Sequence, residues 1–308
     1  MTGGPRRHFC DRLAALVEER RSRVVLGLDP DPAALWPEAL GHFGTEEDAG
    51  HLARVRTAEA VAAHCRAAIV AAGPACVAVK PQLACFERLG APGWEALEQT
   101  VAVARDHGLL VIADGKRGDV PVTARAYAQA LVGETDGPFG PVEGLGADAF
   151  TANPLLGRDS LEPLIDAAAA AGAGCFLLVR TSNPGAGELQ DEGDPPLHER
   201  LARIADELGA SQTGECGLSL VGAVAGATQP GLLGRLRELM PRAVFLLPGV
   251  GAQGGRVEDL KPAFAPHPAA GLVTASRSIV NAHAERGGEP AAAAAAAAEE
   301  LRVAAWEL

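Results

Sequence analysis

The sequence predicts an α/β protein built as a (β/α)8 TIM barrel. Eight short apolar runs recur along the 308 residues, and each is followed by a helical stretch or by a loop leading into one. Charged and amide side chains gather where these runs end, while the interiors of the runs stay apolar, as in a parallel sheet covered on both faces. A doubly wound open sheet is the alternative, because counting strands does not establish that the sheet closes.

The elements are expected to alternate along the chain. The eight strands are expected at residues 23–28, 76–79, 109–113, 147–152, 174–179, 218–224, 243–247 and 271–275. Helices are expected at 46–72, 94–107, 121–131, 160–171, 197–208 and 232–239. The Gly- and Pro-rich stretch 133–146 is expected to be an excursion on the surface.

Both ends of the chain are expected to be helical. Residues 9–20 form an amphipathic pattern suited to capping the bottom of a barrel. The alanine-rich tract 291–298 is predicted to be a helix, because alanine is the strongest helix former and Leu301 and Trp306 follow to pack it down. No break in composition demands two domains, so we expect residues 1–308 to form a single domain.

Composition excludes several classes of protein. A net charge of −12 argues against a general nucleic-acid or anionic-membrane surface. No run of about 20 apolar residues is present for a membrane span, and the first residues lack the apolar core of a signal peptide. The six cysteines contain no C-x-x-C pair, which favours small core residues in a reducing cytoplasm over a disulfide or zinc site.

The stretch 109–119 is the centre of the predicted chemistry. Five apolar residues end at Asp114, and Lys116 follows two positions later, on the same side of an extended chain and about 7 Å further along it. Asp119 comes after a glycine turn. An Asp/Lys/Asp cluster at the carboxyl end of a parallel strand lies where α/β enzymes keep catalytic groups. A surface salt bridge at a strand end is the alternative explanation.

Other strand ends also carry polar groups. Asp29 follows the first strand, Lys80 the second, Asn153 the fourth and Ser182 the fifth. Taken singly, each has a simpler explanation: Asp29 precedes a proline in a turn, and Asn153-Pro is a common turn opener. Taken together, they place polar side chains at one rim of the barrel, which favours a site there.

A phosphate site is predicted after the seventh and eighth strands. Gly249, Gly251, Gly254 and Gly255 leave backbone amides free to approach an anion, and Arg277 offers a bidentate fork. Barrels often bind phosphate in these two loops. A flexible glycine loop with a surface arginine is the alternative.

The motif Asp114-Gly-Lys-Arg-Gly-Asp119 resembles the D-x-K-x-x-D motif of orotidine 5′-phosphate decarboxylases, and the chain looks like their longer bacterial type from residue 9 to about 282. Further matching blocks are Gly27-Leu-Asp-Pro, Val79-Lys-Pro-Gln-Leu-Ala-Cys-Phe-Glu-Arg, Asn153-Pro-Leu-Leu-Gly, Arg180-Thr-Ser-Asn-Pro-Gly, Val221-Gly-Ala, Pro248-Gly-Val-Gly-Ala-Gln-Gly-Gly and Ala275-Ser-Arg. The family usually has alanine where this chain has Gly115. Since both side chains are small, we expect no change of activity.

The resemblance implies roles for the residues of the motif. Lys116 would donate a proton to C6 of the pyrimidine, and Asp114 would lie near the departing carboxylate. Lys80 and Asp119 would complete an alternating network of charges that orients Lys116. Asp119 and Thr123 would reach the active site of the other subunit, which implies a homodimer with shared active sites.

The resemblance also implies how substrate and product are bound. Orotidine 5′-phosphate and UMP would contact Asp29 and Thr123 through the ribose, Ser182 through the pyrimidine edge, and Gln253 and Arg277 through the phosphate. Asn153 matches a family position to which no role is assigned here. The loops at 183–196 and 249–255 are the candidates for closure over the substrate.

No cofactor or metal is implied, because fixed charges can stabilise the C6 carbanion directly. A magnesium-dependent sugar-phosphate decarboxylase or aldolase of the same superfamily is an alternative, although it would place a carboxylate metal ligand where this chain has Lys80. A non-catalytic barrel that binds a phosphate ligand is another. The set of two lysines and two aspartates argues against it, because simple binding does not need carboxylates beside an anion.

Overall fold

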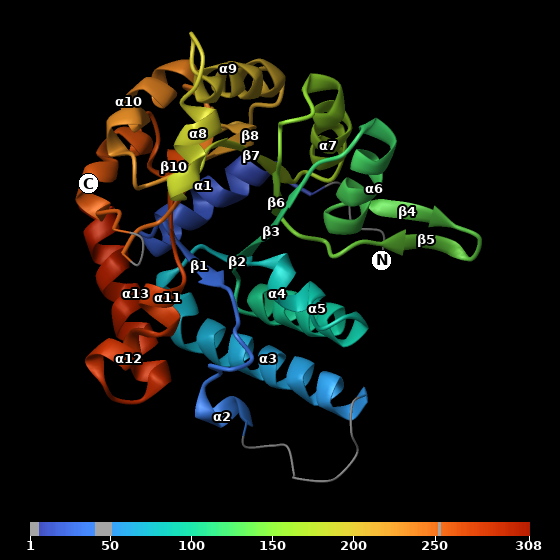
Figure 1. Ribbon diagram of the computed structural model, residues 1–308, viewed down its shortest axis with the longest axis vertical. Helices are drawn as coiled ribbons and strands as arrows, with labels where there is room; N and C mark the ends of the chain where they lie inside the picture. Colours follow the sequence, from blue (N-terminus) through green and yellow to red (C-terminus); the bar gives the residue numbers. More distant parts are fainter. Residues whose placement is uncertain (1–5, 41–50, 252–253) are drawn as a thin grey trace.

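The computed structural model describes residues 6–40, 51–251 and 254–308, and within them eight parallel strands form a closed barrel (Figure 1). Around the barrel the strands follow the order β1 (Val24–Leu28), β10 (Gly271–Ala275), β9 (Ala243–Pro248), β8 (Ser219–Ala225), β7 (Gly174–Arg180), β6 (Ala149–Ala152), β3 (Leu110–Arg117) and β2 (Ala78–Pro81). Closure comes from β1, which pairs with β2 on one side and with β10 on the other. The (β/α)8 prediction is confirmed, and the open sheet is excluded.

Helices surround the barrel (Figure 1). They are α1 (Phe9–Arg20), α2 (Pro37–Leu40), α3 (His51–Ala72), α4 (Leu83–Glu87), α5 (Ala91–Asp106), α6 (Pro121–Leu131), α7 (Arg158–Ala170), α8 (Gly187–Gln190), α9 (Leu197–Gly209), α10 (Pro230–Leu239), α11 (Arg277–Val280), α12 (Ala282–Arg286) and α13 (Pro290–Trp306). The predicted helix at 46–72 is described only from residue 51 onward. Short 3-10 helices occupy Gly73–Ala75, Pro184–Ala186, Val257–Phe264 and Pro268–Ala270.

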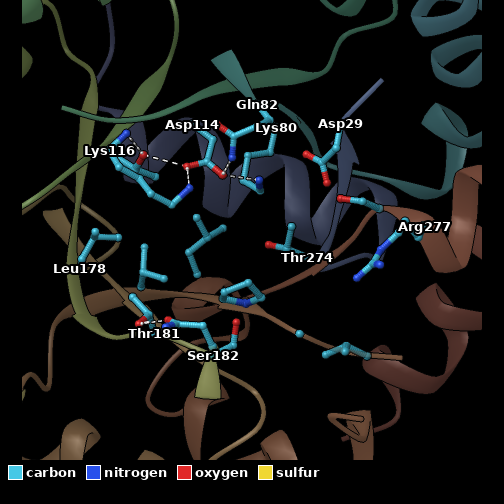
Figure 2. Close-up of a pocket in the computed structure, with 18 of the residues that line it drawn as sticks. Asp29, Lys80, Gln82, Asp114, Lys116, Leu178, Thr181, Ser182, Thr274 and Arg277 are labelled. Atoms are coloured by element: carbon cyan, nitrogen blue, oxygen red, sulfur yellow. Dashed lines mark hydrogen bonds and ion pairs between the residues drawn. The ribbon is translucent and has the colours of Figure 1, made fainter. Parts of the chain in front are cut away.

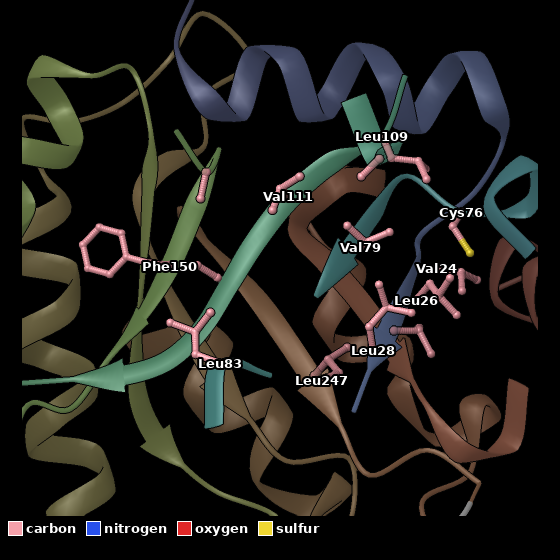
Figure 3. Packing of buried hydrophobic residues seen from close by; sticks show 14 of the residues in the cluster. Val24, Leu26, Leu28, Cys76, Val79, Leu83, Leu109, Val111, Phe150 and Leu247 are labelled. Carbon is pink, nitrogen blue, oxygen red and sulfur yellow. The ribbon is translucent and has the colours of Figure 1, made fainter. Parts of the chain in front are cut away.

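Alternation along the strands divides the buried residues into two clusters. In β1, Val24, Leu26 and Leu28 belong to the cluster between barrel and helices (Figure 3), while Val25 belongs to the cluster inside the barrel. Side chains point to opposite faces at successive positions of a strand. Where a strand is regular, every second residue therefore faces the barrel axis, and the last inward position lies at the carboxyl end.

Helix α1 packs against the opposite, amino-terminal end of the barrel. Its Phe9 ring meets Phe176 of β7 edge to face at a centroid distance of 6.0 Å. The Arg12 guanidinium pairs with the carboxylate of Asp148, which also accepts the amide N–H of Val111 at 2.9 Å. With that end filled by α1, the carboxyl ends of the strands are the end available to a ligand.

Strand β3 is longer than the apolar run predicted at 109–113. It continues through the charged residues to Arg117. Ala113 pairs with Phe150 of β6, and the next paired residue is Arg117 with Ala152. The intervening residues of β3 therefore form a bulge opposite a single residue of β6. The Gly- and Pro-rich stretch that follows α6 folds into an exposed hairpin of β4 (Glu134–Gly137) and β5 (Gly140–Glu143).

Close packing at the carboxyl end of β1 depends on a glycine. A Cβ atom at Gly27 would lie 1.8 Å from Oγ of Ser276, just before the predicted phosphate ligand Arg277. Glycine there lets β1 and the end of β10 approach each other. All six cysteines are free thiols, as the sequence predicts. No helix in the described ranges is both long and apolar enough to cross a membrane.

Candidate active site

A cavity of about 820 Å³ opens at the carboxyl end of the barrel. Six of the residues predicted for the site line it: Asp29, Lys80, Asp114, Lys116, Ser182 and Arg277. In Figure 2, Lys116, Asp114, Lys80 and Asp29 follow one another along one wall, Arg277 lies beyond Asp29, and Ser182 faces this wall from across the cavity. The sequence prediction that one rim gathers these groups is confirmed for these six residues.

Strand alternation explains why the charged residues point inward. Leu110 and Ile112 of β3 belong to the cluster inside the barrel, so Asp114, two positions after Ile112, faces the axis as well. Lys80 stands in the same relation to Ala78 of β2. The strands thus end in a polar layer stacked directly on an apolar interior.

Asp114 is the centre of this layer. Its Oδ2 accepts hydrogen bonds from Nζ of Lys80 at 2.5 Å and from Nε2 of Gln82 at 3.3 Å. Its Oδ1 accepts from Nζ of Lys116 at 2.7 Å and from the hydroxyl of Thr151 at 2.9 Å. A carboxylate has about four lone-pair positions, so these four donors satisfy and fix it.

The charged groups of this cluster keep one another ionised. Burial alone would raise the pKa of Asp114, but the ammonium groups of Lys80 and Lys116 outweigh it and hold the pKa well below its usual range. Burial alone would lower the pKa of Lys80, but Asp114 and Asp29 reverse this, and the pKa lies above its usual value. The side chain of Lys80 is only 8% exposed, whereas that of Lys116 is 43% exposed. Lys116 is therefore the ammonium open to a ligand.

The backbone at Lys116 is unusual. Its φ of 49° lies in the left-handed region, which non-glycine residues seldom adopt and which costs of order 1–3 kcal/mol. Simple strand alternation correctly predicts that Asp114 and Lys116 share a side. It does not predict the bulge that brings their side chains into contact.

The wall opposite Asp114 is formed by the end of β7 and the loop after it. Gln190 of α8 lines the cavity, and its Oε1 accepts the amide N–H of Thr181 at 2.8 Å. The neighbouring Asp191 receives Nε and Nη2 of Arg180 at 2.8 and 3.0 Å. The long polar loop at 183–196 is therefore tied to the strand end that presents Ser182.

The predicted phosphate end agrees with the structure only in part. Arg277 lines the cavity, and within the described ranges its side chain makes no hydrogen bond or ion pair, so its donors are available to an anion. The expectation that the glycine amides are free was wrong for three of the four glycines. The amides of Gly251, Gly254 and Gly255 donate to the carbonyls of Gly255, Gly251 and Gly249, so they are already paired within the same stretch of chain. Gln253 lies outside the described residues.

Besides Gly251, three predicted residues do not line this cavity. The carboxylate of Asp119 accepts the N–H of its own neighbour Val120 at 2.7 Å, and Thr123 is exposed near the start of α6. Asn153 caps the turn after β6, where its Oδ1 accepts the N–H of Leu155 at 3.0 Å. These contacts agree with the simpler explanation, in which Asn153 opens a turn.

Sequence reasoning missed several polar residues of the cavity. They are Gln82, Thr151, Thr181, Asn183, Gln190, Thr274, Ser276 and Ser278. A usable signal existed for Thr151 and Thr274, because each lies two positions after an inward apolar residue in a predicted strand. The Thr274 hydroxyl is buried without a partner in the described part of the chain, which suits a group that meets a bound ligand. Among the residues that the structure describes, no group of three or more His, Cys, Asp or Glu side chains is arranged to bind a metal.

Comparisons with known proteins agree on one family. Residues 22–297 match the model of the orotidine 5′-phosphate decarboxylase / HUMPS family. The chain is 39% identical over 277 residues to the orotidine 5′-phosphate decarboxylase of Rhodopirellula baltica, covering 89% of each chain. It is 40% identical over 272 residues to that of Deinococcus radiodurans, covering 88% of each. The crystal structure of a putative orotidine 5′-phosphate decarboxylase from Streptomyces avermitilis superposes with a TM-score of 0.76 at 31% identity, covering 99% of this chain and 97% of that one.

Proposed function

This chain belongs to the orotidine 5′-phosphate decarboxylase family and converts orotidine 5′-phosphate to UMP in pyrimidine biosynthesis, and we propose that Lys116, Asp114 and Lys80 carry out the reaction. The observation that carries this proposal is the carboxylate of Asp114 held between two ammonium groups at the inner wall of the cavity. Lys116 is the more exposed of the two, so it is the one that meets the substrate.

The order of residues along the cavity supports one orientation of the substrate. The phosphate binds at Arg277, the ribose hydroxyls at Asp29, and the pyrimidine ring between Ser182 and Lys116 (Figure 2). The carboxylate of the substrate then lies beside Asp114. Binding energy from the distant phosphate holds this like-charged pair together, and loss of CO2 relieves the repulsion.

The chemistry requires stabilisation of a carbanion. The bond between C6 and the carboxylate breaks, CO2 leaves, and the electron pair stays on C6. No carbonyl adjacent to C6 delocalises this pair, so the fixed ammonium of Lys116 stabilises it electrostatically. Nζ of Lys116 then gives its proton to C6 and becomes a neutral amine, which regains a proton from water. Lys80 keeps Asp114 ionised and in position throughout.

A homodimer with shared active sites forms part of the proposal. Asp119 and Thr123 do not line the cavity of their own chain, although they follow the residues that do. The surface around them carries exposed apolar side chains: Val120, Val122, Leu155 and Leu156 are 54%, 84%, 71% and 48% exposed. Such a patch favours burial against a second copy, in which Asp119 and Thr123 complete the partner's site.

We also place the enzyme in the cytoplasm as a single (β/α)8 domain. Six free thiols, four of them buried, suit a reducing compartment. The strands of the barrel extend from β1 to β10 along the chain, so every part of the site depends on one closed sheet.

The test is decarboxylation by the purified protein after exhaustive EDTA treatment, followed by the change in ultraviolet absorbance of orotidine 5′-phosphate. Full turnover is expected without added metal, because Lys80 places a cation where a metal-dependent relative would need a ligand. Turnover that required Mg²⁺, or turnover of sugar phosphates in its place, would contradict the proposal.

A further inference from the structure

Thr151 connects the backbone and the side chains of the catalytic motif through one hydroxyl group. Its Oγ lies 2.9 Å from the amide nitrogen of Lys116 and 2.9 Å from Oδ1 of Asp114. The amide can only donate, and the ionised carboxylate can only accept. The direction of both bonds is therefore fixed: the oxygen accepts from Lys116, and the hydroxyl proton goes to Asp114.

The bulge in β3 explains why this contact matters. Phe150 and Ala152 of β6 pair with Ala113 and Arg117 of β3, so Thr151 alone stands opposite the three residues from Asp114 to Lys116. The amide of Lys116 is displaced from the regular ladder, and Thr151 supplies the acceptor that the ladder does not. The left-handed backbone at Lys116 is held by that bond.

We propose that Thr151 is a positioning residue that fixes the bulge and thereby aligns the Lys116 ammonium with Asp114 for proton transfer. This inference rests on the proposed role of Lys116 as proton donor. Thr151 is 1% exposed, so water does not replace its hydroxyl when the hydroxyl is removed. The lost contact leaves a strained amide without an acceptor and a carboxylate with one donor fewer.

The test compares Thr151→Val, which keeps the shape but lacks the hydroxyl, with Thr151→Ser, which keeps the hydroxyl. For orotidine 5′-phosphate, we expect kcat of Thr151→Val to fall about tenfold to a hundredfold, with KM and UMP affinity within about threefold of the native values. Thr151→Ser should recover kcat to within about threefold. Thr100→Val is the matched control, because Thr100 is equally buried and its hydroxyl bonds to Ala96 within α5 and to the thiol of Cys65, not to the residues of the catalytic motif.

Three outcomes would overturn the inference: native kcat in Thr151→Val, a rise in KM with kcat unchanged, or equal losses in the Val and Ser variants. If Thr151→Val does not fold by circular dichroism, Thr151→Ala and Thr151→Ser give the same comparison, since they differ only by the hydroxyl. Lys116→Ala separates this inference from the proposed function. Native turnover by Lys116→Ala would overturn both, whereas an inactive Lys116→Ala beside a fully active Thr151→Val would overturn only the role of Thr151.

Discussion

At the scale of single residues, Asp114 determines the character of the site. Four donors surround its carboxylate, and two of them are cations. A buried ion pair contributes little compared with an apolar replacement of both partners, but removing one partner leaves the other charge uncompensated. The cluster is therefore most sensitive to the loss of Asp114, the carboxylate that both ammonium groups contact.

Asp114→Asn is expected to lower the free energy of unfolding by about 3 kcal/mol at pH 7, because it leaves the ammonium of Lys80 buried beside a neutral group. The folded-state pKa of Asp114 lies below that of the unfolded chain. Its stabilising contribution is thus fully present above about pH 4 and is lost as the pH falls through the folded-state pKa. Denaturant unfolding of both proteins at pH 7 and at pH 3.5, or about half a unit below the unfolded value, measures the difference.

The difference between Asp114→Asn and the native protein should shrink at the lower pH. Asp136→Asn, on the exposed hairpin, is the control and should change stability little at either pH. A difference that grew as the pH fell would contradict the depressed pKa of Asp114.

The side chains that line the site could be predicted from the residue types at the strand ends. The backbone conformation around them could not. Asp29, Lys80, Asp114, Lys116, Ser182 and Arg277 all line the cavity, because strand alternation and the common edge of a parallel sheet are simple geometry. Three of the four glycine amides after β9 were wrongly predicted to be free, since composition does not tell whether an amide already donates to a nearby carbonyl. Thr151 carries no charge and was not predicted, although its place in the strand alternation marks it as facing inward.

At the scale of elements, the loop after β7 is held by a local network. Arg180 is 4% exposed at the end of β7, and its guanidinium binds both oxygens of Asp191. Asp191 directly follows Gln190, which lines the cavity. The position of this wall therefore depends on an ion pair outside the cavity.

Asp191→Ala is expected to raise KM for orotidine 5′-phosphate about fivefold to tenfold, with kcat within about threefold, because the loop that carries Gln190 loses its tie to β7. Steady-state kinetics and limited proteolysis of the loop measure the effect. Glu188→Ala, which changes an exposed residue of α8, is the control. Unchanged KM and unchanged protease resistance in Asp191→Ala would show that the ion pair does not hold the loop.

Elements were predicted best where their pattern is strongest. The long amphipathic helices and the apolar strands follow the expected order because burial imposes their periodicity. The extension of β3 through charged residues was not predicted, since an exposed-looking sequence does not reveal that a buried cluster neutralises it. The connection between β9 and β10 includes the 3-10 helix Val257–Phe264, which was not predicted. This helix contains Pro262, which cannot donate a backbone hydrogen bond.

At the scale of the whole molecule, closure is a long-range property. β1 closes the barrel against β10, from the other end of the chain, through pairs such as Val24 with Val273. Local sequence patterns predict the number of strands but not which strands pair with each other. The pairing of β1 with β10 establishes closure, and the proposed dimer comes from the family resemblance and not from the strand count.

Mixed dimers test the shared active site. Lys116→Ala and Asp119→Ala should each be nearly inactive as homodimers. After joint dissociation and reassembly, about half of the dimers are mixed, and in each of these one site has both native residues. About one quarter of all sites should then recover decarboxylation. A mixture as inactive as its parents, with subunit exchange demonstrated, would place Asp119 in the site of its own chain.

The role of Lys116 as the proton donor is tested most directly by single-turnover decarboxylation of orotidine 5′-phosphate by Lys116→Ala. The chain has three lysines, and Lys261, exposed on a 3-10 helix far from the motif in sequence, provides the control Lys261→Ala. We expect Lys116→Ala to lose about a thousandfold or more in rate while its UMP affinity stays within about tenfold, and Lys261→Ala to match the native enzyme. A Lys116→Ala enzyme that kept more than about a tenth of the native rate would contradict this role.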